Sequence, residues 1–170
     1  MHIRQATIKD LKSILVLFNQ YRDFYKKERD EISAEEFLSA SLLKNQSIIF
    51  IATEDEDSNQ VVGFARLIPG YCSLELTKYW VLYDLYTDEN HRHKGVATDL
   101  LSAIKTFATE DGASRVDLQT AHTNLLAQKL YEKNGYKKDE AFCTYTLVLS
   151  RKVNECNLDQ EKTARISMKK

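Results

Sequence analysis

The chain has 170 residues, 43% of them hydrophobic and 29% charged, which predicts a single globular domain able to bury a core of its own. Five glycines and one proline are too few for a collagen-like or low-complexity protein. The 24 basic and 25 acidic residues leave a formal net charge of -1, so we expect neither nucleic acid nor a membrane surface as a partner.

Cysteine and histidine show no pattern of a disulfide framework or a metal site. The three cysteines are widely separated and form no CxxC pair. His91 and His93 share one segment without a spaced third ligand, so we expect no metal. Residues 1–10 lack the pattern of a signal peptide, and no window reaches the roughly 18 apolar residues of a membrane span. These features favour a reducing, cytoplasmic location.

Hydrophobic periodicity assigns most of the chain to strands and helices. In chain order, we expect a strand over residues 2–6, helices over 8–25 and 32–43, strands over 47–53, 60–68 and 79–87, a helix over 96–111, a strand over 114–120, a helix over 124–134 and a strand over 142–149. This order predicts an α/β fold with a mixed sheet rather than a doubly wound one. Residues 1–150 form the predicted domain, and the charged residues 151–170 are expected to be a polar C-terminal tail.

Several polar and turn-forming residues indicate where these elements begin and end. Asp10 is the expected N-cap of the first helix, and Ser33 with Glu36 forms the expected capping box of the second. Pro69 and Gly70 are expected to end or bend the strand that precedes them.

The segment between the strand over 79–87 and the helix over 96–111 has the composition of an anion site. It reads Arg92-His93-Lys94-Gly95-Val96-Ala97. Free backbone N–H groups at the start of a helix, the positive end of the helix dipole and a glycine without a side chain allow a phosphate to approach closely. By itself the segment fits an exposed basic turn equally well, because the chain has no P-loop motif and too few glycines for a dinucleotide loop.

Further motifs lie on both sides of this loop. They are Tyr83-Asp84-Leu85-Tyr86-Thr87, Arg92-x-x-Gly95-x-Ala97, Leu100-Leu101, Asp117-Leu118-Gln119-Thr120, Asn124, Ala127 and Leu130-Tyr131-Glu132-Lys133-Asn134-Gly135-Tyr136. Together with the opening Ile3-Arg4-Gln5-Ala6-Thr7, this ordered set resembles the GNAT family of N-acetyltransferases over nearly all of residues 1–150. Ala97 stands where many members carry a second glycine.

The resemblance implies a mixed, mostly antiparallel sheet whose central parallel strands splay apart, flanked by helices. It also implies acetyl-CoA as cosubstrate, with its pantetheine arm paired along Leu85, Tyr86 and Thr87. An open strand edge supplies the partners that the arm's amides need, and the Leu85 amide becomes a candidate oxyanion donor. The implied pyrophosphate site consists of Arg92, His93, Lys94, Gly95, Val96, Ala97 and Thr98.

By the same resemblance, Tyr131 takes the place of the residue that meets the sulfur of coenzyme A. A phenol with a pKa of about 10 stays protonated at neutral pH and can give a proton to a thiolate whose pKa is near 8.5. Without the motif, a tyrosine on an amphipathic helix is more often a core residue. Asn124 is expected either to cap its helix or to bind the cofactor arm, and Lys133 either to reach the adenosine phosphates or to stay solvated.

A general base is needed because a primary amine is mostly protonated at neutral pH and must lose a proton before it attacks. Asp84 is the only carboxylate within the strand over residues 79–87, where an unpaired charge is costly, so it is the candidate base. A structural aspartate bonded to a neighbouring tyrosine is an equal alternative. Some relatives place a glutamate at the position of Val81, so a water relayed by Asp84 or Tyr83 is a further alternative.

The acceptor pocket is expected beside the first two helices and the turn at Pro69-Gly70-Tyr71. Aromatic and acidic side chains there suit a cationic amine, although such aromatics are as often core residues. The expected lining is Tyr21, Phe24, Tyr25, Asp30 and Tyr83.

We therefore predict an N-acetyltransferase that moves acetyl from acetyl-CoA to the primary amine of a small molecule, by direct attack in a ternary complex. A protein lysine or N-terminal amine is the alternative acceptor, and a non-catalytic acyl-CoA-binding regulatory module is the alternative from another class. Acetylation of charged tRNA would require a basic surface that the near-neutral charge does not indicate. The resemblance leaves the oligomeric state open, with a homodimer as one alternative.

Overall fold

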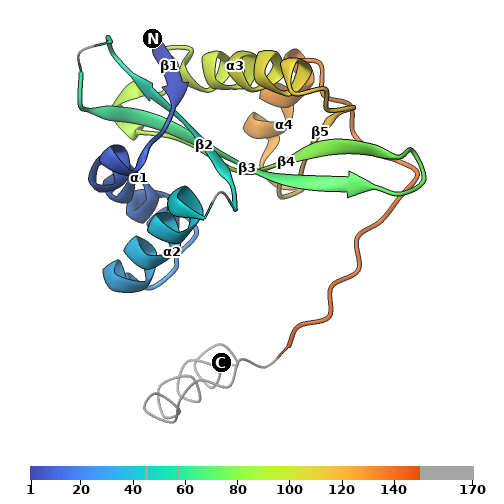
Figure 1. Cartoon of the computed structure of the whole chain (residues 1–170), viewed down its shortest axis with the longest axis horizontal. Helices are drawn as coiled ribbons and strands as arrows, with labels where there is room; N and C mark the ends of the chain where they lie inside the picture. The colour runs from blue at the N-terminus through green and yellow to red at the C-terminus, as the bar shows by residue number, and fades with distance from the viewer. Residues whose placement is uncertain (45, 57, 150–170) are drawn as a thin grey trace. The chain divides into compact units, whose positions relative to one another are not determined.

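The structure is a computed structural model that describes residues 1–44, 46–56 and 58–149 (Figure 1). The chain divides into two compact units, Met1–Lys137 and Lys138–Lys170, and the first contains every regular element described here. The predicted polar tail, residues 151–170, lies outside the described residues, so the boundary expected after residue 150 stays a prediction.

A five-stranded sheet forms the centre of the first unit, with strands in the order β1-β2-β3-β4-β5. The strands are β1 (His2–Gln5), β2 (Ile48–Thr53), β3 (Val61–Cys72), β4 (Thr77–Thr87) and β5 (Val116–Leu118). The first three pairings are antiparallel and the pairing of β4 with β5 is parallel. The prediction of a mixed, mostly antiparallel sheet is therefore confirmed.

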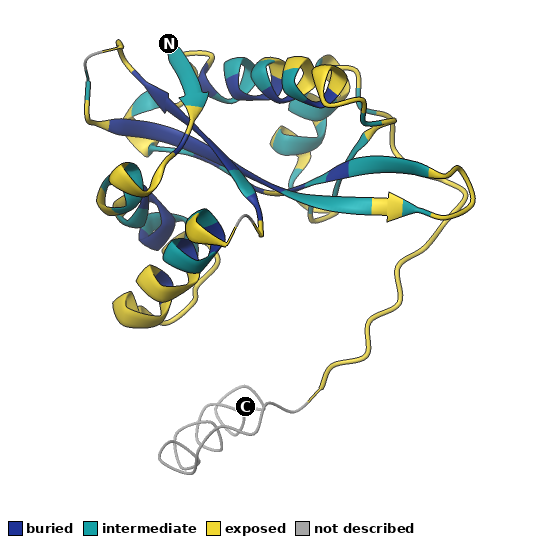
Figure 2. Cartoon of the chain, viewed as in Figure 1, coloured by how far each residue is buried: buried dark blue, intermediate teal, exposed yellow. Residues whose placement is uncertain are grey.

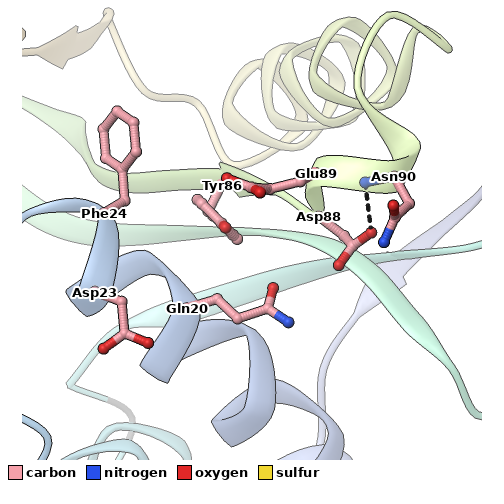
Figure 3. Close-up of a pocket in the computed structure, with 7 residues that line it drawn as sticks. All are labelled: Gln20, Asp23, Phe24, Tyr86, Asp88, Glu89 and Asn90. Atoms are coloured by element: carbon pink, nitrogen blue, oxygen red, sulfur yellow. Dashed lines mark hydrogen bonds between the residues drawn. The ribbon is translucent and has the colours of Figure 1, made fainter.

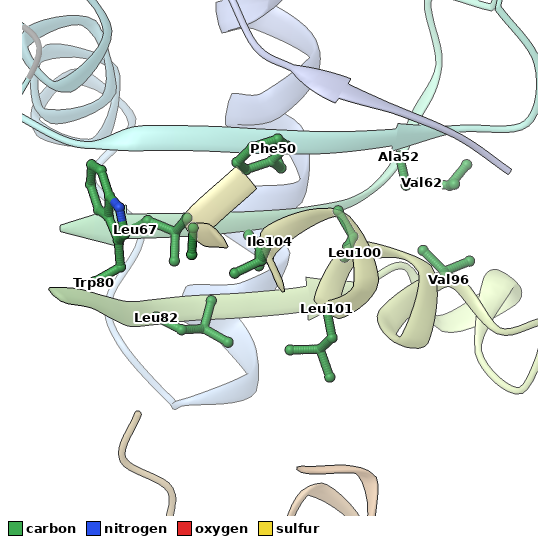
Figure 4. Close-up of a cluster of buried hydrophobic side chains, with 12 residues drawn as sticks. Phe50, Ala52, Val62, Leu67, Trp80, Leu82, Val96, Leu100, Leu101 and Ile104 are labelled. Carbon is green, nitrogen blue, oxygen red and sulfur yellow. The ribbon is translucent and has the colours of Figure 1, made fainter. Parts of the chain in front are cut away.

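Helices cover both faces of this sheet (Figures 1 and 2). They are α1 (Leu11–Phe24), α2 (Glu31–Leu43), α3 (Val96–Glu110) and α4 (Leu125–Lys133), with single 3-10 turns at η1 (Ile8–Asp10) and η2 (Glu89–His91). One apolar cluster joins α3 to the sheet and a second joins α1 and α2 to the opposite face. Leu100 and Ile104 of α3, one helical turn apart, are fully buried in the first cluster (Figure 4).

The parallel strands splay apart, as predicted. Pairing between β4 and β5 runs from Trp80 opposite Val116 to Leu82 opposite Leu118 and ends there. Strand β4 nevertheless continues to Thr87, bonded on its other side to β3. Within the described residues, the last part of β4 therefore has one edge with no neighbouring strand.

A β-bulge lies in β4 at the point where the splay begins. Arg66 of β3 is paired with Asp84, but the next residue, Leu67, is paired with Leu82, so Tyr83 is the extra residue. Because strand side chains alternate between faces, the extra residue shifts the alternation by one. As a result Leu82 and Leu85 both face the α3 cluster, and Asp84 faces α1 and α2.

Two details of the predicted helix starts need correction. Asp10 is the N-cap residue of α1, as predicted, but its side chain makes no cap bond there; its carboxylate accepts the Thr7 N–H in a capping box around η1 and is paired with Arg4. Asp30, rather than Ser33, caps α2, because its carboxylate accepts the Ser33 N–H at 3.0 Å. The sequence shows both aspartates, Asp10 and Asp30. Which N–H group each carboxylate reaches depends on the path of the backbone before the helix, and the sequence does not give that path.

Strand β3 also continues through Pro69 and Gly70 instead of ending there. The pairing of β3 with β2 stops at Ile48 opposite Leu67, so beyond that point β3 has only β4 beside it. A proline is tolerated where a strand has a free edge, because its missing N–H leaves no gap in a hydrogen-bond ladder.

The predicted last strand is absent. Residues 142–149 of the second unit take no strand conformation, and Phe142, Tyr145 and Leu147 are exposed. A strand needs a neighbour for its backbone groups, and the described part of the second unit contains no other strand.

Candidate acyl-transfer site

The open edge of β4 carries outward-pointing backbone groups. The Asp88 N–H donates to the Val62 carbonyl of β3 at 2.9 Å. Peptide groups of successive strand residues point alternately to either side, so the N–H groups of Tyr86 and Asp84 point to β3 as well. Those of Leu85 and Thr87 therefore point to the unpaired edge, where a ligand with amide groups can bind as a strand would.

Helix α3 begins beside this edge without a side-chain cap. Gly95 is its N-cap, with a left-handed φ of 87°. The first bond of the helix is from Asp99 N–H to the Gly95 carbonyl at 3.0 Å, which leaves the N–H groups of Val96, Ala97 and Thr98 before it. A Cβ built on Gly95 meets no atom within 4 Å. The residues present thus fit a bound phosphate group.

The turn η2 fixes the approach to this cradle. The Asp88 carboxylate accepts the Asn90 N–H at 2.9 Å and lies 2.9 Å from His91 Nδ1, and the hydrogen bond with His91 lowers the pKa of Asp88. The other ring nitrogen of His91 lies 3.1 Å from a Glu54 oxygen, beyond the end of β2. His91 therefore ties the loop before α3 to the β2–β3 connection.

A pocket of about 420 Å³ opens between α1 and the end of β4 (Figure 3). Its lining residues are Gln20, Asp23, Phe24, Tyr86, Asp88, Glu89 and Asn90. The guanidinium of Arg92, the first residue of the cradle loop, lies 5.8 Å from the centre of the Tyr86 ring and 6.0 Å from that of Phe24. The pocket therefore adjoins the cradle.

Two of the three acidic side chains that line this pocket are paired with arginines. Asp23 lies 2.6 Å from Arg29, and Glu89 lies 3.2 Å from Arg92. The third, Asp88, lies 2.9 Å from His91 Nδ1. Paired carboxylates attract a cationic ligand less than free ones do.

Tyr131 lies half-buried on α4, with its ring edge-on to Tyr136 at 5.8 Å between centres. Burial raises its pKa, with a smaller contribution from Tyr25, so the phenol is protonated at neutral pH. Tyr25 is the C-cap residue of α1. The Tyr25 ring is in turn edge-on to Tyr21 at 5.1 Å.

A buried polar cluster lies on the other side of Tyr21. Its hydroxyl donates a hydrogen bond to Asp84, and burial, followed by the charge of Asp84, raises the pKa of Tyr21 well above its usual value. Asp84 also accepts a hydrogen bond from Arg66 Nε at 2.5 Å. The candidate base is thus a buried carboxylate held by two donors.

Comparison with known proteins supports the assignment that this geometry suggests. The profile of the Acetyltransferase (GNAT) family matches residues 14–136. The chain belongs to the GNAT acetyltransferase family. GNAT enzymes generally use acetyl-CoA as the acetyl donor, and the protein is an acetyltransferase of this type.

Individual GNAT relatives agree with the family assignment. An uncharacterized N-acetyltransferase of Bacillus subtilis, YhfO, is 42% identical, over 86% of this chain and 97% of its own length. A crystal structure of a probable acetyltransferase superimposes with a TM-score of 0.84 at 36% identity, covering 89% of this chain and 99% of the other. An aminoglycoside acetyltransferase from a soil metagenome, meta-AAC0020, has a TM-score of 0.75 at 21% identity, covering 88% and 96%, and indicates a shared fold.

The GNAT fold brings together several of the residues predicted from the sequence. Tyr25 and Asp84 are linked through Tyr21 by the contacts described above, and Tyr83 is the bulge residue next to Asp84. The side chain of Tyr86 is buried against Tyr21 and so faces away from the open edge. The side chains of the cradle residues Arg92, His93 and Lys94 are exposed.

Other predicted residues have structural partners or lie apart. Asn124 caps α4 by accepting the Ala127 N–H at 3.2 Å. Asp30 caps α2 and is exposed, and Lys133 is exposed in the last turn of α4. Pro69, Gly70 and Tyr71, predicted to form a turn beside the acceptor pocket, belong to strand β3 and are paired with residues 78–80 of β4.

Sequence reasoning missed Arg66. It is a single cation inside the apolar run Val61–Cys72, and a charged residue in a buried strand is itself a signal that a partner exists. That partner, Asp84, is 18 residues away, and only the pairing of β3 with β4 identifies it.

Two further properties concern the described ranges. No set of three or more His, Cys, Asp or Glu side chains in them has an arrangement that could hold a metal. None of the helices described is long and apolar enough to cross a membrane.

Proposed function

We propose that this GNAT acetyltransferase transfers acetyl from acetyl-CoA to the primary amine of a small molecule, by direct attack in a ternary complex. The observation that carries the proposal is the adjacency of the unpaired β4 edge and the uncapped start of α3. The edge offers the N–H groups of Leu85 and Thr87, and the helix offers those of Val96 to Thr98. Together they match a molecule with an amide arm and a diphosphate.

Bound acetyl-CoA supplies an acetyl thioester, whose C–S bond breaks as the acceptor nitrogen bonds to the acetyl carbon. The Leu85 N–H, which points to the open edge, donates a hydrogen bond to the developing oxyanion. Tyr86 lies between the donors Leu85 and Thr87 with its own N–H directed to β3, and Arg92, His93, Lys94, Gly95 and Ala97 belong to the diphosphate cradle. Asn124 and Lys133 remain candidates for the cofactor arm and the adenosine phosphates.

Tyr131 donates its hydroxyl hydrogen toward the sulfur that leaves. Burial keeps the phenol protonated at neutral pH, which is the state that a donor needs. Its pKa lies above that of a thiol, so complete transfer of the proton to a free thiolate is unfavourable. Hydrogen bonding to the sulfur is therefore its main contribution, and this predicts a modest effect on the rate.

The acceptor loses its proton to water beside the exposed Tyr83. Asp84 is buried and already accepts hydrogen bonds from Arg66 and Tyr21, so we assign it the positioning of these two side chains rather than direct contact with the amine. Tyr25, half-exposed between Tyr21 and Tyr131, belongs to the wall of the acceptor site. Asp30 is exposed and already caps α2, so it is the weakest of the candidates.

Calorimetry with acetyl-CoA, followed by release of free thiol over a panel of small amines with mass detection of the products, tests the proposal. We expect binding and at least one acetylated amine. Binding without turnover on any amine would favour a regulatory module, and turnover on peptide amines alone would favour a protein acceptor.

We further propose a cytoplasmic location and a homodimer. A reducing cytoplasm agrees with the free thiols of Cys72 and Cys143. The homodimer is tested by light scattering of the purified full chain.

A further inference from the structure

Arg66 has more hydrogen-bond donors than the protein uses. Its Nε donates to Asp84, and no oxygen among the described residues accepts a hydrogen bond from Nη1 or Nη2. A guanidinium carries five N–H donors, four of them on these terminal nitrogens. Arg66 is only 6% exposed, so the rest of its side chain is held in place by the protein. The N–H groups on the two terminal nitrogens of Arg66 are therefore available to a ligand.

Two aromatic rings fix the orientation of these N–H groups. The guanidinium lies over the ring of Phe37, 4.9 Å from its centre, and over the ring of Tyr83, 5.0 Å from its centre. With aromatic rings against the guanidinium, a new partner is best placed in its plane. Arg22 Nε is buried without a partner, but the terminal nitrogens of Arg66 are not among such atoms and so reach solvent. The donors are therefore oriented and accessible.

The charge of Arg66 is balanced without these donors. Asp84 neutralises it through Nε, and Tyr21 donates a second hydrogen bond to the same carboxylate. A pair with this many bonds does not need the terminal nitrogens for its own stability. The free N–H groups on the terminal nitrogens of Arg66 suit a ligand that accepts two parallel hydrogen bonds. A carboxylate has that geometry.

The position of Arg66 relates this ligand to the acyl-transfer site. Arg66 is paired with Asp84, the residue next to Leu85, whose N–H points to the open edge. Phe37 and Tyr83, which flank the guanidinium, are 45% and 63% exposed, so the surroundings of Arg66 are open to solvent on this side of the sheet. We propose that Arg66 binds a carboxylate on the acceptor, so that the preferred substrates are amines that also carry a carboxylate, such as amino acids. This inference rests on the proposed acetyltransferase function.

The test compares matched acceptors. Alanine, leucine and phenylalanine are each assayed beside their carboxamides and their decarboxylated amines, with β-alanine beside propylamine to vary the spacing. We expect kcat/KM for the carboxylate form to exceed that of its carboxamide by about tenfold to a hundredfold, through KM, because two charge-assisted hydrogen bonds are made to the carboxylate. Equal use of both forms by the wild-type enzyme would overturn the inference and leave the proposed function intact.

Two variants connect the preference to Arg66. Arg66→Lys keeps a cation beside Asp84 but cannot offer the planar fork, so the ratio of carboxylate to carboxamide should fall to within about twofold. Arg115→Lys is the control, because Arg115 also pairs with an aspartate through Nε, at 3.0 Å, and lies over a tyrosine ring at 4.2 Å. It should keep the wild-type ratio.

Folding and cosubstrate binding are measured for each variant. Where Arg66→Lys fails to fold, Arg66→Met combined with Asp84→Asn removes both charges and leaves no unpaired ion. A variant that binds acetyl-CoA as tightly as the wild type and keeps the carboxylate preference would refute the role of Arg66. If the wild-type protein binds no acetyl-CoA, the proposed function fails and this inference fails with it.

Discussion

Replacing Gly95 with alanine tests whether the start of α3 holds a diphosphate. Gly95 has a φ of 87°, and a Cβ placed there meets no protein atom within 4 Å. The substitution therefore causes no clash inside the protein, and its conformational cost is that of a left-handed alanine, about 1–2 kcal/mol. The methyl group occupies the space next to the free N–H groups of Val96 to Thr98, where the phosphates are expected.

The other end of the same helix provides a matched control. Gly112 has a φ of 71° and equally open surroundings, but it follows α3 and lies roughly 22 Å from Gly95. Both alanine variants should lose similar free energy of unfolding in urea. Only Gly95→Ala should bind coenzyme A more weakly, by about tenfold or more, which corresponds to about 1.4 kcal/mol in calorimetry.

Two results would contradict this reasoning. Unchanged affinity for coenzyme A in a folded Gly95→Ala protein would mean that the phosphates lie elsewhere. An equal loss of affinity in Gly112→Ala would mean that the effect comes from general destabilisation of α3 and not from the cradle.

Two further predictions concern Tyr131 and Asp10. Tyr131→Phe should lower turnover by about tenfold to a hundredfold. The control is Tyr136→Phe, which removes the hydroxyl of the neighbouring ring, where burial raises the pKa to about 12; its turnover should stay within about twofold of the wild type. Equal losses of turnover in thiol-release kinetics would indicate that Tyr131 has a packing role. Hydrogen bonding to Arg4 lowers the pKa of Asp10 to about 2, so its stabilisation is present above pH 4 and is lost as the pH falls through 2. Asp10→Asn should therefore cost roughly 1–2 kcal/mol at pH 7, allowing for solvent screening, and far less at pH 2; a cost independent of pH in chemical denaturation would argue against the ion pair.

The elements that position the site could be predicted because their signals are local. The apolar spacing of α3 and the dense β-branched and aromatic content of β4 placed both elements to within two residues of their observed ends, and the cradle between them followed from the sequence. The same local reasoning failed for residues 142–149, because an apolar alternation indicates a strand only where a neighbour exists to pair with it.

The chemistry of the site depends more on long-range contacts. Asp84 was identified as a carboxylate in an unusual place, but its partners, Arg66 and Tyr21, come from β3 and α1. The extra residue at Tyr83 decides which face Asp84 occupies, and a bulge has no dependable local signature. A sequence can therefore name the reactive side chains before it can tell which of them are already engaged.

The bulge also makes β4 tolerant of a change in length at one position. Deleting the single codon for Tyr83 would remove no buried side chain, and it would leave Arg66 opposite Asp84 and Leu67 opposite Leu82 as consecutive, regular pairs. Asp84 and Tyr86 would keep facing α1 and α2, and Leu85 would keep facing the α3 cluster. An in-frame deletion of this one exposed residue should thus leave the enzyme folded, while it straightens the strand beside the open edge and removes the ring that lies over Arg66.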